Sequence, residues 1–168
     1  MCDIRENGRE LLVNNGFEEG SARPDFWNSF ASRQYINAGK PGEEVRSGKG
    51  SVVLNSPDGN DCRWYSGAVA VTPGSPCLLS AWVKTENFDA DDVVQLRIER
   101  LRDKQYIGMF AAPGQRGNGS WRKMELLFVP DTAEIRVLLV AGYGENRKSP
   151  AAAKAYFDDV SLKTLEQK

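Results

Sequence analysis

The stretch Val94-Gln95-Leu96-Arg97-Ile98-Glu99 decides the fold class of this sequence. Its apolar and polar residues alternate strictly, which predicts a β-strand with one buried face and one face exposed to water. The same alternation returns at Ile135, Val137 and Leu139. We therefore expect sheets of short strands rather than helices.

Glycine and proline residues separate further runs that are rich in β-branched and aromatic side chains, as in all-β proteins. The clearest predicted turn is Thr72-Pro73-Gly74-Ser75-Pro76, because proline is excluded from a central strand. Only residues 149–154 suggest a helical turn, and they read equally well as a loop. The pattern predicts roughly ten strands, as in a β-sandwich or jelly roll: 11–14, a strand near Trp27, 51–54, 63–71, 77–85, about 94–99, 106–112, 121–129, 135–139 and 156–162.

Composition narrows the chemistry available to the chain. Its 168 residues suit one domain. The absence of histidine excludes Ser-His-Asp and Cys-His catalysis and imidazole zinc sites. A formal net charge of -1 gives no electrostatic attraction to nucleic acid or to an anionic membrane. Carboxylate chemistry remains open, for example between the distant residues Glu99 and Glu125, although a binding protein without catalysis is the favoured interpretation.

The apolar runs are all shorter than the roughly 18 to 20 residues that a membrane-spanning helix needs. The N-terminus carries no hydrophobic signal-peptide core, so the sequence is either intracellular or a mature segment. Three cysteines leave at least one thiol without an intramolecular disulfide. Cys62 and Cys77 flank one predicted turn; spacing does not decide between a bond and two free thiols.

Several short motifs follow one another in a recognisable order. They are Leu11-Leu12-Val13-Asn14-Asn15-Gly16-Phe17-Glu18-Glu19-Gly20, Ser47-Gly48-Lys49-Gly50, Tyr65-Ser66-Gly67-Ala68, Leu79-Ser80-Ala81-Trp82-Val83-Lys84-Thr85, Trp121-Arg122-Lys123 with Phe128-Val129-Pro130, and Tyr156-Phe157-Asp158-Asp159-Val160-Ser161-Leu162. Together they resemble carbohydrate-binding modules of the galactose-binding-domain-like jelly-roll type, which are appended to xylanases, cellulases and laminarinases. The resemblance covers about residues 11–163, with tails at 1–10 and 164–168. It implies an all-β jelly-roll β-sandwich of two antiparallel sheets.

The resemblance also implies a structural calcium ion that ties the N-terminal segment to the last strand. Calcium binds oxygen ligands and needs no imidazole or thiolate. The alternative is that Glu18 and Asp158 accept backbone hydrogen bonds and join the two termini without metal. The implied ligands are a carbonyl at Gly16, carboxylates at Glu18 and Glu44, a carbonyl near Ser47, and the carboxylate of Asp158, with Asp159 as the fallback.

A second implied site is a sugar cleft on the concave sheet, where an aromatic ring stacks on a pyranose. The family's Trp-x-Gly-Ala motif places its aromatic residue at Tyr65, with Trp64 beside it. Strand alternation across 63–71 favours Trp64 as the exposed ring, whereas the motif favours Tyr65, so both are predicted ligand-binding residues. Polar and aromatic partners are predicted at Gln95, Arg97, Glu99, Tyr106, Arg136 and Tyr143. An ordinary exposed strand face would carry similar polar residues.

The other tryptophans have a more ordinary interpretation. Trp82 and Trp121 lie within predicted strands beside apolar residues, so we expect them to pack in the core. Trp27 lies where the family often has a Trp that caps one sheet, and we expect it to be structural.

These observations favour a non-catalytic carbohydrate-binding module that targets an attached enzyme or cell-surface protein to a polysaccharide. The near-zero net charge favours a neutral polysaccharide over an acidic one such as pectin. We expect an extracellular or cell-surface location, a monomer, and a longer multidomain chain. The alternatives are a structural or adhesion β-sandwich of a surface or phage-tail protein without sugar affinity, and a carboxylate-based polysaccharide hydrolase or lyase.

Overall fold

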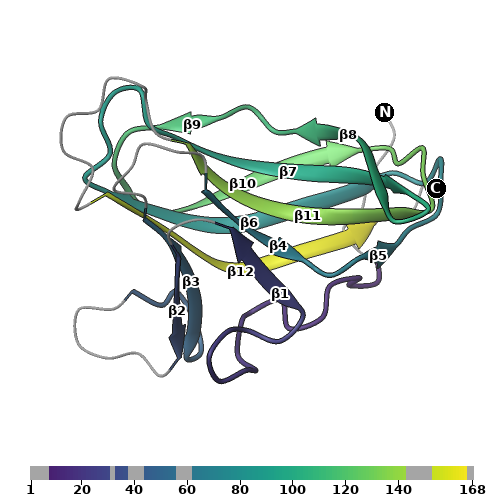
Figure 1. Cartoon of the computed structure of the whole chain (residues 1–168). Coiled ribbons are helices and arrows are strands. Elements are labelled where there is room, and N and C mark those ends of the chain that lie inside the picture. The colour runs from purple at the N-terminus through teal and green to yellow at the C-terminus, as the bar shows by residue number, and fades with distance from the viewer. Residues whose placement is uncertain (1–7, 31–32, 38–43, 56–61, 143–152, 166–168) are drawn as a thin grey trace.

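The computed structural model describes residues 8–30, 33–37, 44–55, 62–142 and 153–165, and within these ranges every regular element is a strand. The alternating stretch 94–99 lies in β7 (Val93–Arg102), one of the longest strands (Figure 1). The strands are β1 (Trp27–Phe30), β2 (Arg33–Asn37), β3 (Gly50–Leu54), β4 (Cys62–Ser66), β5 (Val69–Ala70), β6 (Cys77–Glu86), β7 (Val93–Arg102), β8 (Gln105–Ala111), β9 (Gln115–Arg116), β10 (Gly119–Phe128), β11 (Glu134–Gly142) and β12 (Lys154–Thr164).

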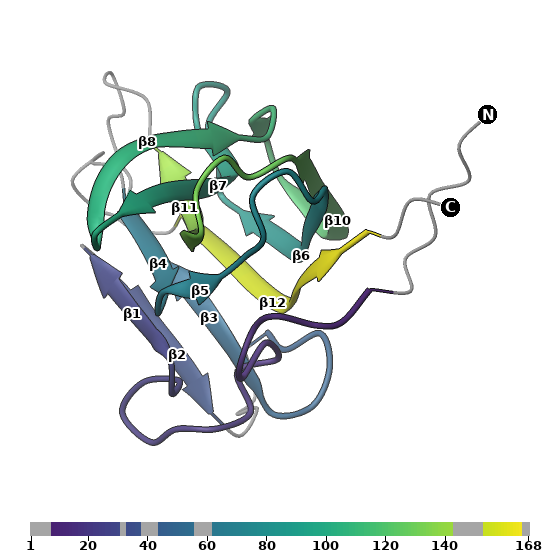
Figure 2. The ribbon, with the colours of Figure 1, turned by 90° about the vertical axis from the view of Figure 1, so that its right-hand side faces the viewer.

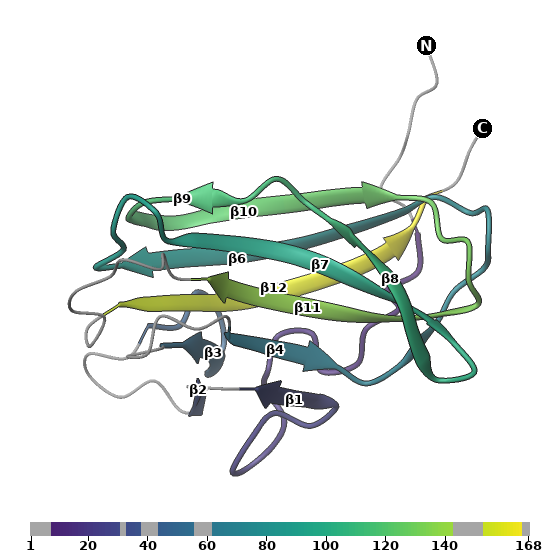
Figure 3. The ribbon, with the colours of Figure 1, turned by 45° about the horizontal axis from the view of Figure 1, so that its top comes forward.

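The strands form two antiparallel sheets. The seven-stranded sheet has the order β1-β4-β11-β7-β8, with β5 paired to β11 and β9 paired to β7. The five-stranded sheet has the order β10-β6-β12-β3-β2. Figures 2 and 3 show the two sheets as layers, with β7 and β11 in one and β6 and β12 in the other. The predicted jelly-roll sandwich is therefore confirmed.

The core fills the space between the sheets. Val94, Leu96 and Ile98 are fully buried, as their alternation with polar residues predicts. From the facing sheet, Leu79 and Val83 are also fully buried. Each such aliphatic side chain contributes about 1.5 to 3 kcal/mol when it leaves water, so the residues of the period-two pattern also stabilise the fold. Trp27 belongs to this core, as predicted, and its indole donates to the Asn14 carbonyl at 3.2 Å.

Several strand boundaries differ from the prediction. Residues 11–14 form no strand: the Leu11 amide donates to the Leu162 carbonyl at 2.9 Å, but Asn14 already has a positive φ of 49° and turns the chain away. β2 and β9 were not predicted. β9 has only two residues and lies within a glycine-rich segment.

The predicted strand 63–71 is interrupted at Gly67. The Gly67 amide donates to the Phe26 carbonyl at 2.7 Å, and a β-carbon at Gly67 would come within 2.5 Å of the Phe26 ring. The strand therefore divides into β4 and β5, and alternation does not continue across the break. As a result Trp64 and Val69 both point inward, although their positions have opposite parity.

Cys62 and Cys77 are both buried, and no disulfide joins them. Of the predicted helical turn, residues 149–152 lie outside the described ranges, and Lys154 instead begins β12. Among the described residues there is no helix that is long and apolar enough to cross a membrane.

Candidate functional site

β4 carries the two adjacent aromatic residues on which the predicted cleft depends. Trp64 is 1% exposed, and its indole Nε1–H donates a hydrogen bond to the Val53 carbonyl at 3.1 Å. Tyr65 projects from the opposite face of the sheet and is half-buried. The expectation that Trp64 is the exposed ring is therefore wrong, because the alternation was read across the break at Gly67. Trp64 is a core residue, and Tyr65 lies on the outer face of the seven-stranded sheet.

The antiparallel register brings polar and aromatic side chains from four strands to this outer face. Phe30 of β1 lies opposite Arg63 of β4, and Arg136 of β11 lies opposite Glu99 of β7. Paired residues project from the same side of a sheet, so both pairs share the face of Tyr65. We call these five residues the sheet-face site.

The sheet-face site lines a pocket of about 170 Å³. Its Phe30 side chain is 57% exposed, whereas Glu99 is largely buried with a side-chain exposure of 15%. The pocket is smaller than the roughly 300 to 1,000 Å³ typical of small-molecule sites. An open hollow of this kind on a sheet face suits one unit of an extended ligand better than an enclosed small molecule.

The aromatic rings of the site are each held by a guanidinium group. The Cζ of Arg136 lies 5.3 Å from the centre of the Tyr65 ring, and that of Arg63 lies 5.1 Å from the centre of the Phe30 ring. Both distances are within the range of about 6 Å for cation–π attraction. Arg136 also donates from Nη1 to Glu99 Oε2 at 3.2 Å. These contacts fix flat apolar surfaces next to polar groups, the combination that sugar recognition requires.

The remaining predicted cleft residues are distributed more widely. Gln95 donates to the Ala112 carbonyl at 2.7 Å and accepts from Arg97 Nε at 2.6 Å, so both side chains are held along β7. Tyr106 is 55% exposed on β8 opposite Leu101 and does not line the pocket. Tyr143 lies outside the described residues.

The sequence prediction missed Phe30 and Arg63. Arg63 could have been found, because it lies two residues before Tyr65 on one strand and residues i and i+2 share a face. Phe30 could not, because only the pairing of β1 with β4 brings it to the site.

The opposite outer face carries the two tryptophans that were expected in the core. Trp82 is half-buried on the five-stranded sheet, and the Arg46 guanidinium lies 3.8 Å from the centre of its ring. Trp121 is also only partly buried and packs on a small separate cluster formed by Ile36, Val53 and Tyr156. The core prediction is therefore wrong for Trp82, because its position on β6 alternates with the inward-facing residues Ala81 and Val83.

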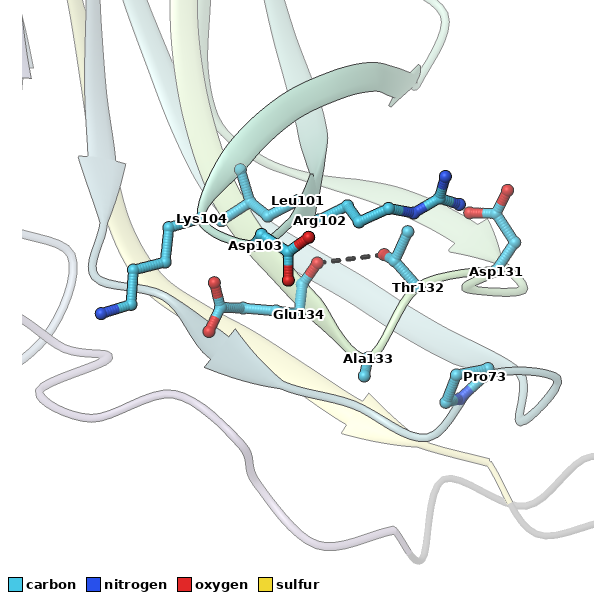
Figure 4. Close-up of a pocket in the computed structure, with 9 residues that line it drawn as sticks. All are labelled: Pro73, Leu101, Arg102, Asp103, Lys104, Asp131, Thr132, Ala133 and Glu134. Atoms are coloured by element: carbon cyan, nitrogen blue, oxygen red, sulfur yellow. Dashed lines mark hydrogen bonds between the residues drawn. The ribbon is translucent and has the colours of Figure 1, made fainter.

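A larger pocket of about 470 Å³ lies where the β7–β8 turn approaches the β10–β11 turn (Figure 4). In Figure 4 the Arg102 guanidinium points toward the Asp131 carboxylate, and the Thr132 hydroxyl donates to the Glu134 carbonyl at 3.0 Å. Among the described residues that line this pocket there is no aromatic side chain. It therefore offers no stacking surface, and we place the candidate site on the sheet face.

The predicted metal ligands gather around residues 46–50. The Glu18 carboxylate accepts hydrogen bonds from the amides of Lys49, at 2.9 Å, and Gly50, at 3.1 Å. The fully buried Asp158 carboxylate accepts from the amides of Arg46, at 2.9 Å, and Ser47, at 3.1 Å. Both carboxylates thus hold the same loop through backbone hydrogen bonds.

Asp158 is unusual in this corner because burial raises its pKa to about 7. The neighbouring Asp159 carboxylate raises this pKa further, and the backbone hydrogen bonds only partly oppose the shift. A buried carboxylate of this kind is stabilised by a bound cation.

The fit to calcium is partial. Gly16 lies beside this corner, since a β-carbon there would be 3.7 Å from Glu18 Cγ and 3.8 Å from Asp159 Oδ1. Glu44 departs from the predicted set, because its carboxylate pairs with Lys84 at 2.8 Å. The described residues contain no cluster of three or more acidic, cysteine or histidine side chains arranged to hold a metal. A calcium ion would therefore depend on Glu18, Asp158 and backbone carbonyls.

The suggested catalytic pair, Glu99 and Glu125, is separated by the whole sandwich. Glu99 belongs to the outer face of the seven-stranded sheet, whereas Glu125 is exposed on β10 of the five-stranded sheet, where it pairs with Lys123 at 2.8 Å. A glycosidase needs two carboxyl groups that face one another across one cleft. These two residues do not satisfy that requirement.

Comparisons with known proteins agree on the fold. No family model and no curated protein sequence matches the chain. Among solved structures, TmCBM61 in complex with β-1,4-galactotriose is 17% identical with a TM-score of 0.64, and the match covers 93% of this chain and 99% of that one. The CBM22-1 xylan-binding domain of Paenibacillus barcinonensis Xyn10C is 16% identical with a TM-score of 0.62, covering 94% and 95%. A family 16 carbohydrate-binding module is 19% identical with a TM-score of 0.62, covering 90% and 98%.

Proteins of other kinds have the same fold. A Stig cyclase from Fischerella sp. TAU is 13% identical with a TM-score of 0.59, and the match covers 96% of this chain and 99% of that one. The enzymatically active domain of the bacteriophage CBA120 tailspike protein 4 is 14% identical with a TM-score of 0.60, covering 92% and 21%. At these identities the likeness establishes the architecture alone. The chain has the jelly-roll fold of carbohydrate-binding modules.

Proposed function

We propose that this chain is a non-catalytic carbohydrate-binding module that binds a polysaccharide on the outer face of its seven-stranded sheet. The observation that carries the proposal is the sheet-face site, where Tyr65 occupies the family's aromatic motif position. The ring of one sugar unit stacks on Tyr65 or Phe30, and Arg136 and Glu99 bond to its polar groups. The solved carbohydrate-binding modules that share the fold support this proposal.

Such a module acts without breaking bonds. It holds its attached enzyme or cell-surface protein near the polysaccharide and so raises the effective concentration of the polysaccharide around that protein. In this proposal the binding domain spans about residues 11–163, is monomeric, belongs to a longer chain and works outside the cell or at its surface.

Affinity electrophoresis through gels that contain xylan, β-glucan, galactan, mannan or pectin tests the proposal. We expect at least one polymer to retard the protein without releasing reducing sugars. Tyr65→Ala should abolish most of that retardation. Leu127→Ala is the matched control, because Leu127 is 55% exposed on the five-stranded sheet. Equal retardation of the wild type and Tyr65→Ala would contradict the sheet-face site.

A cyclase and the enzymatically active domain of a tailspike protein share this fold, so two alternative functions remain open. A structural or adhesion domain predicts no retardation in any gel. A polysaccharide hydrolase or lyase predicts the release of reducing or unsaturated ends. The same experiment therefore separates all three functions.

We also propose a structural calcium ion held by Glu18, Asp158 and the carbonyls near Gly16 and Ser47. The buried Asp158 carboxylate supports this site, because a hard cation would offset the cost of its charge. Thermal melts of chelated protein with and without added calcium test the proposal, and we expect calcium to raise the Tm by several degrees. Magnesium is the control ion. An unchanged Tm, with the fold intact, would mean that the hydrogen bonds alone hold the loop.

A further inference from the structure

The charges of the sheet-face site differ from those of the chain as a whole. The chain carries 22 basic and 23 acidic residues. The pocket itself is lined by Arg63 and Arg136 but by a single acidic side chain, Glu99. A third arginine, Arg97, lies outside this pocket but on the same face of β7, two residues before Glu99. Among the described residues the site is therefore locally basic.

Hydrogen-bond donors in the pocket exceed acceptors. A guanidinium group only donates, and each of the two arginines presents several N–H groups. Glu99 is the one carboxylate, and its Oε2 already accepts from Arg136. A neutral sugar hydroxyl both donates and accepts, so it is best matched by a balanced set of partners. A carboxylate or sulfate only accepts, and it matches a pocket of donors.

Two observations indicate that this donor capacity is unused. Within the part of the chain that the structure describes, Arg136 Nε is buried without a hydrogen-bond partner. The Arg63 guanidinium lies over the Phe30 ring, and no described acidic side chain pairs with it. A buried donor without a partner is costly, and only a ligand oxygen that accepts from Arg136 Nε itself would remove that cost.

We propose that the sheet-face site binds an acidic polysaccharide and that Arg63 and Arg136 take its anionic group, a uronate carboxylate or a sulfate. The proposal rests on the function proposed above and names its ligand class. The planar guanidinium matches a two-oxygen anion, and Tyr65 or Phe30 supplies the stacking surface for the same sugar unit. The net charge of the chain favoured a neutral glycan because it averages over faces that the ligand never touches.

Isothermal titration calorimetry with matched polymers tests this inference. Polygalacturonate and its fully methyl-esterified form share one backbone and differ in charge, and dextran sulfate and dextran form the second pair. We expect at least one of the two charged polymers to bind at least about tenfold more tightly than its neutral partner. Raising sodium chloride from about 50 mM to about 500 mM should weaken that binding. Preference for the carboxylated or the sulfated polymer identifies the anionic group.

Two arginine variants show whether the pocket is responsible. Arg63→Gln should weaken binding of the acidic polymer by about tenfold or more and leave the Tm nearly unchanged. Arg102→Gln is the matched control, since Arg102 is exposed at the end of β7, outside the sheet-face site and beside the separate pocket of Figure 4. Equal losses in both variants would indicate unspecific attraction and would overturn the proposal. Tighter binding of the neutral polymers would also overturn it while leaving the carbohydrate-binding function intact. Binding of none of these four polymers would overturn the acidic-ligand proposal, and retardation by any polymer in the affinity gels would then keep the carbohydrate-binding function.

Discussion

Replacing Trp64 by alanine tests the assignment of the two faces of β4. Trp64 is 1% exposed, and removing such an aromatic side chain from a core costs about 3 to 5 kcal/mol. The change also leaves the Val53 carbonyl without its indole donor, which adds roughly 1 kcal/mol or more. We expect the free energy of unfolding to fall by about 4 to 6 kcal/mol, a large part of the roughly 5 to 15 kcal/mol of a typical domain.

Urea denaturation followed by circular dichroism, with linear extrapolation to water, measures this loss. For a chain of this length the loss corresponds to a fall in Tm of roughly 10 to 20 °C. Trp64→Phe keeps most of the buried ring and loses the hydrogen bond, so it should remain folded and lose about 1 to 2 kcal/mol. Tyr65→Ala is the neighbouring control and should cost about 1 kcal/mol or less. If Tyr65→Ala were the more destabilising of the two alanine variants, Tyr65 would be the inward ring and the site would be misplaced.

Three further predictions follow from particular contacts. In the presence of a chelator, the thermal stability of the protein should decline as the pH rises from about 4 to about 7. The reason is that Asp158 keeps its proton in the folded protein over this range, whereas the unfolded chain releases it. Thermal melts of Asp158→Asn should show a flatter dependence of Tm on pH over the same range. Burial raises the pKa of the Cys77 thiol, so iodoacetamide at pH 8 should label Cys77 only in denaturant, as peptide mass spectrometry would show. Gly50→Ala should lower the Tm by several degrees, since its β-carbon would lie 2.0 Å from the Phe17 carbonyl oxygen; a Tm equal to that of the wild type would contradict that close approach.

Much of the fold could be predicted from the sequence. Alternation of apolar and polar residues is a local property of an extended chain, and it identified β7 and β11 correctly. The prolines around Gly74 marked a real turn, in which the Ser75 amide donates to the Thr72 carbonyl at 3.1 Å. Alternation failed where a distant residue interrupted a strand, as Phe26 does at Gly67.

The candidate site was predicted less completely for the same physical reason. The motif identified Tyr65, and the wet strand faces identified Glu99 and Arg136. Phe30 was missed, because it reaches the pocket only through the pairing of β1 with β4. Such pairings join segments far apart in the chain, and their register depends on the packing of the entire sandwich.

By itself, the sequence determined that this protein is a sandwich of short strands without histidine chemistry, because strand periodicity and residue type are local. Only the tertiary structure decided that Trp64 is a core residue and Tyr65 a surface residue, because the break at Gly67 resets the alternation. It also decided the charge of the candidate site. Net charge is a sum over the whole chain, whereas a ligand meets only the few side chains that strand pairing brings to one face, and here these are mainly arginines and aromatic rings.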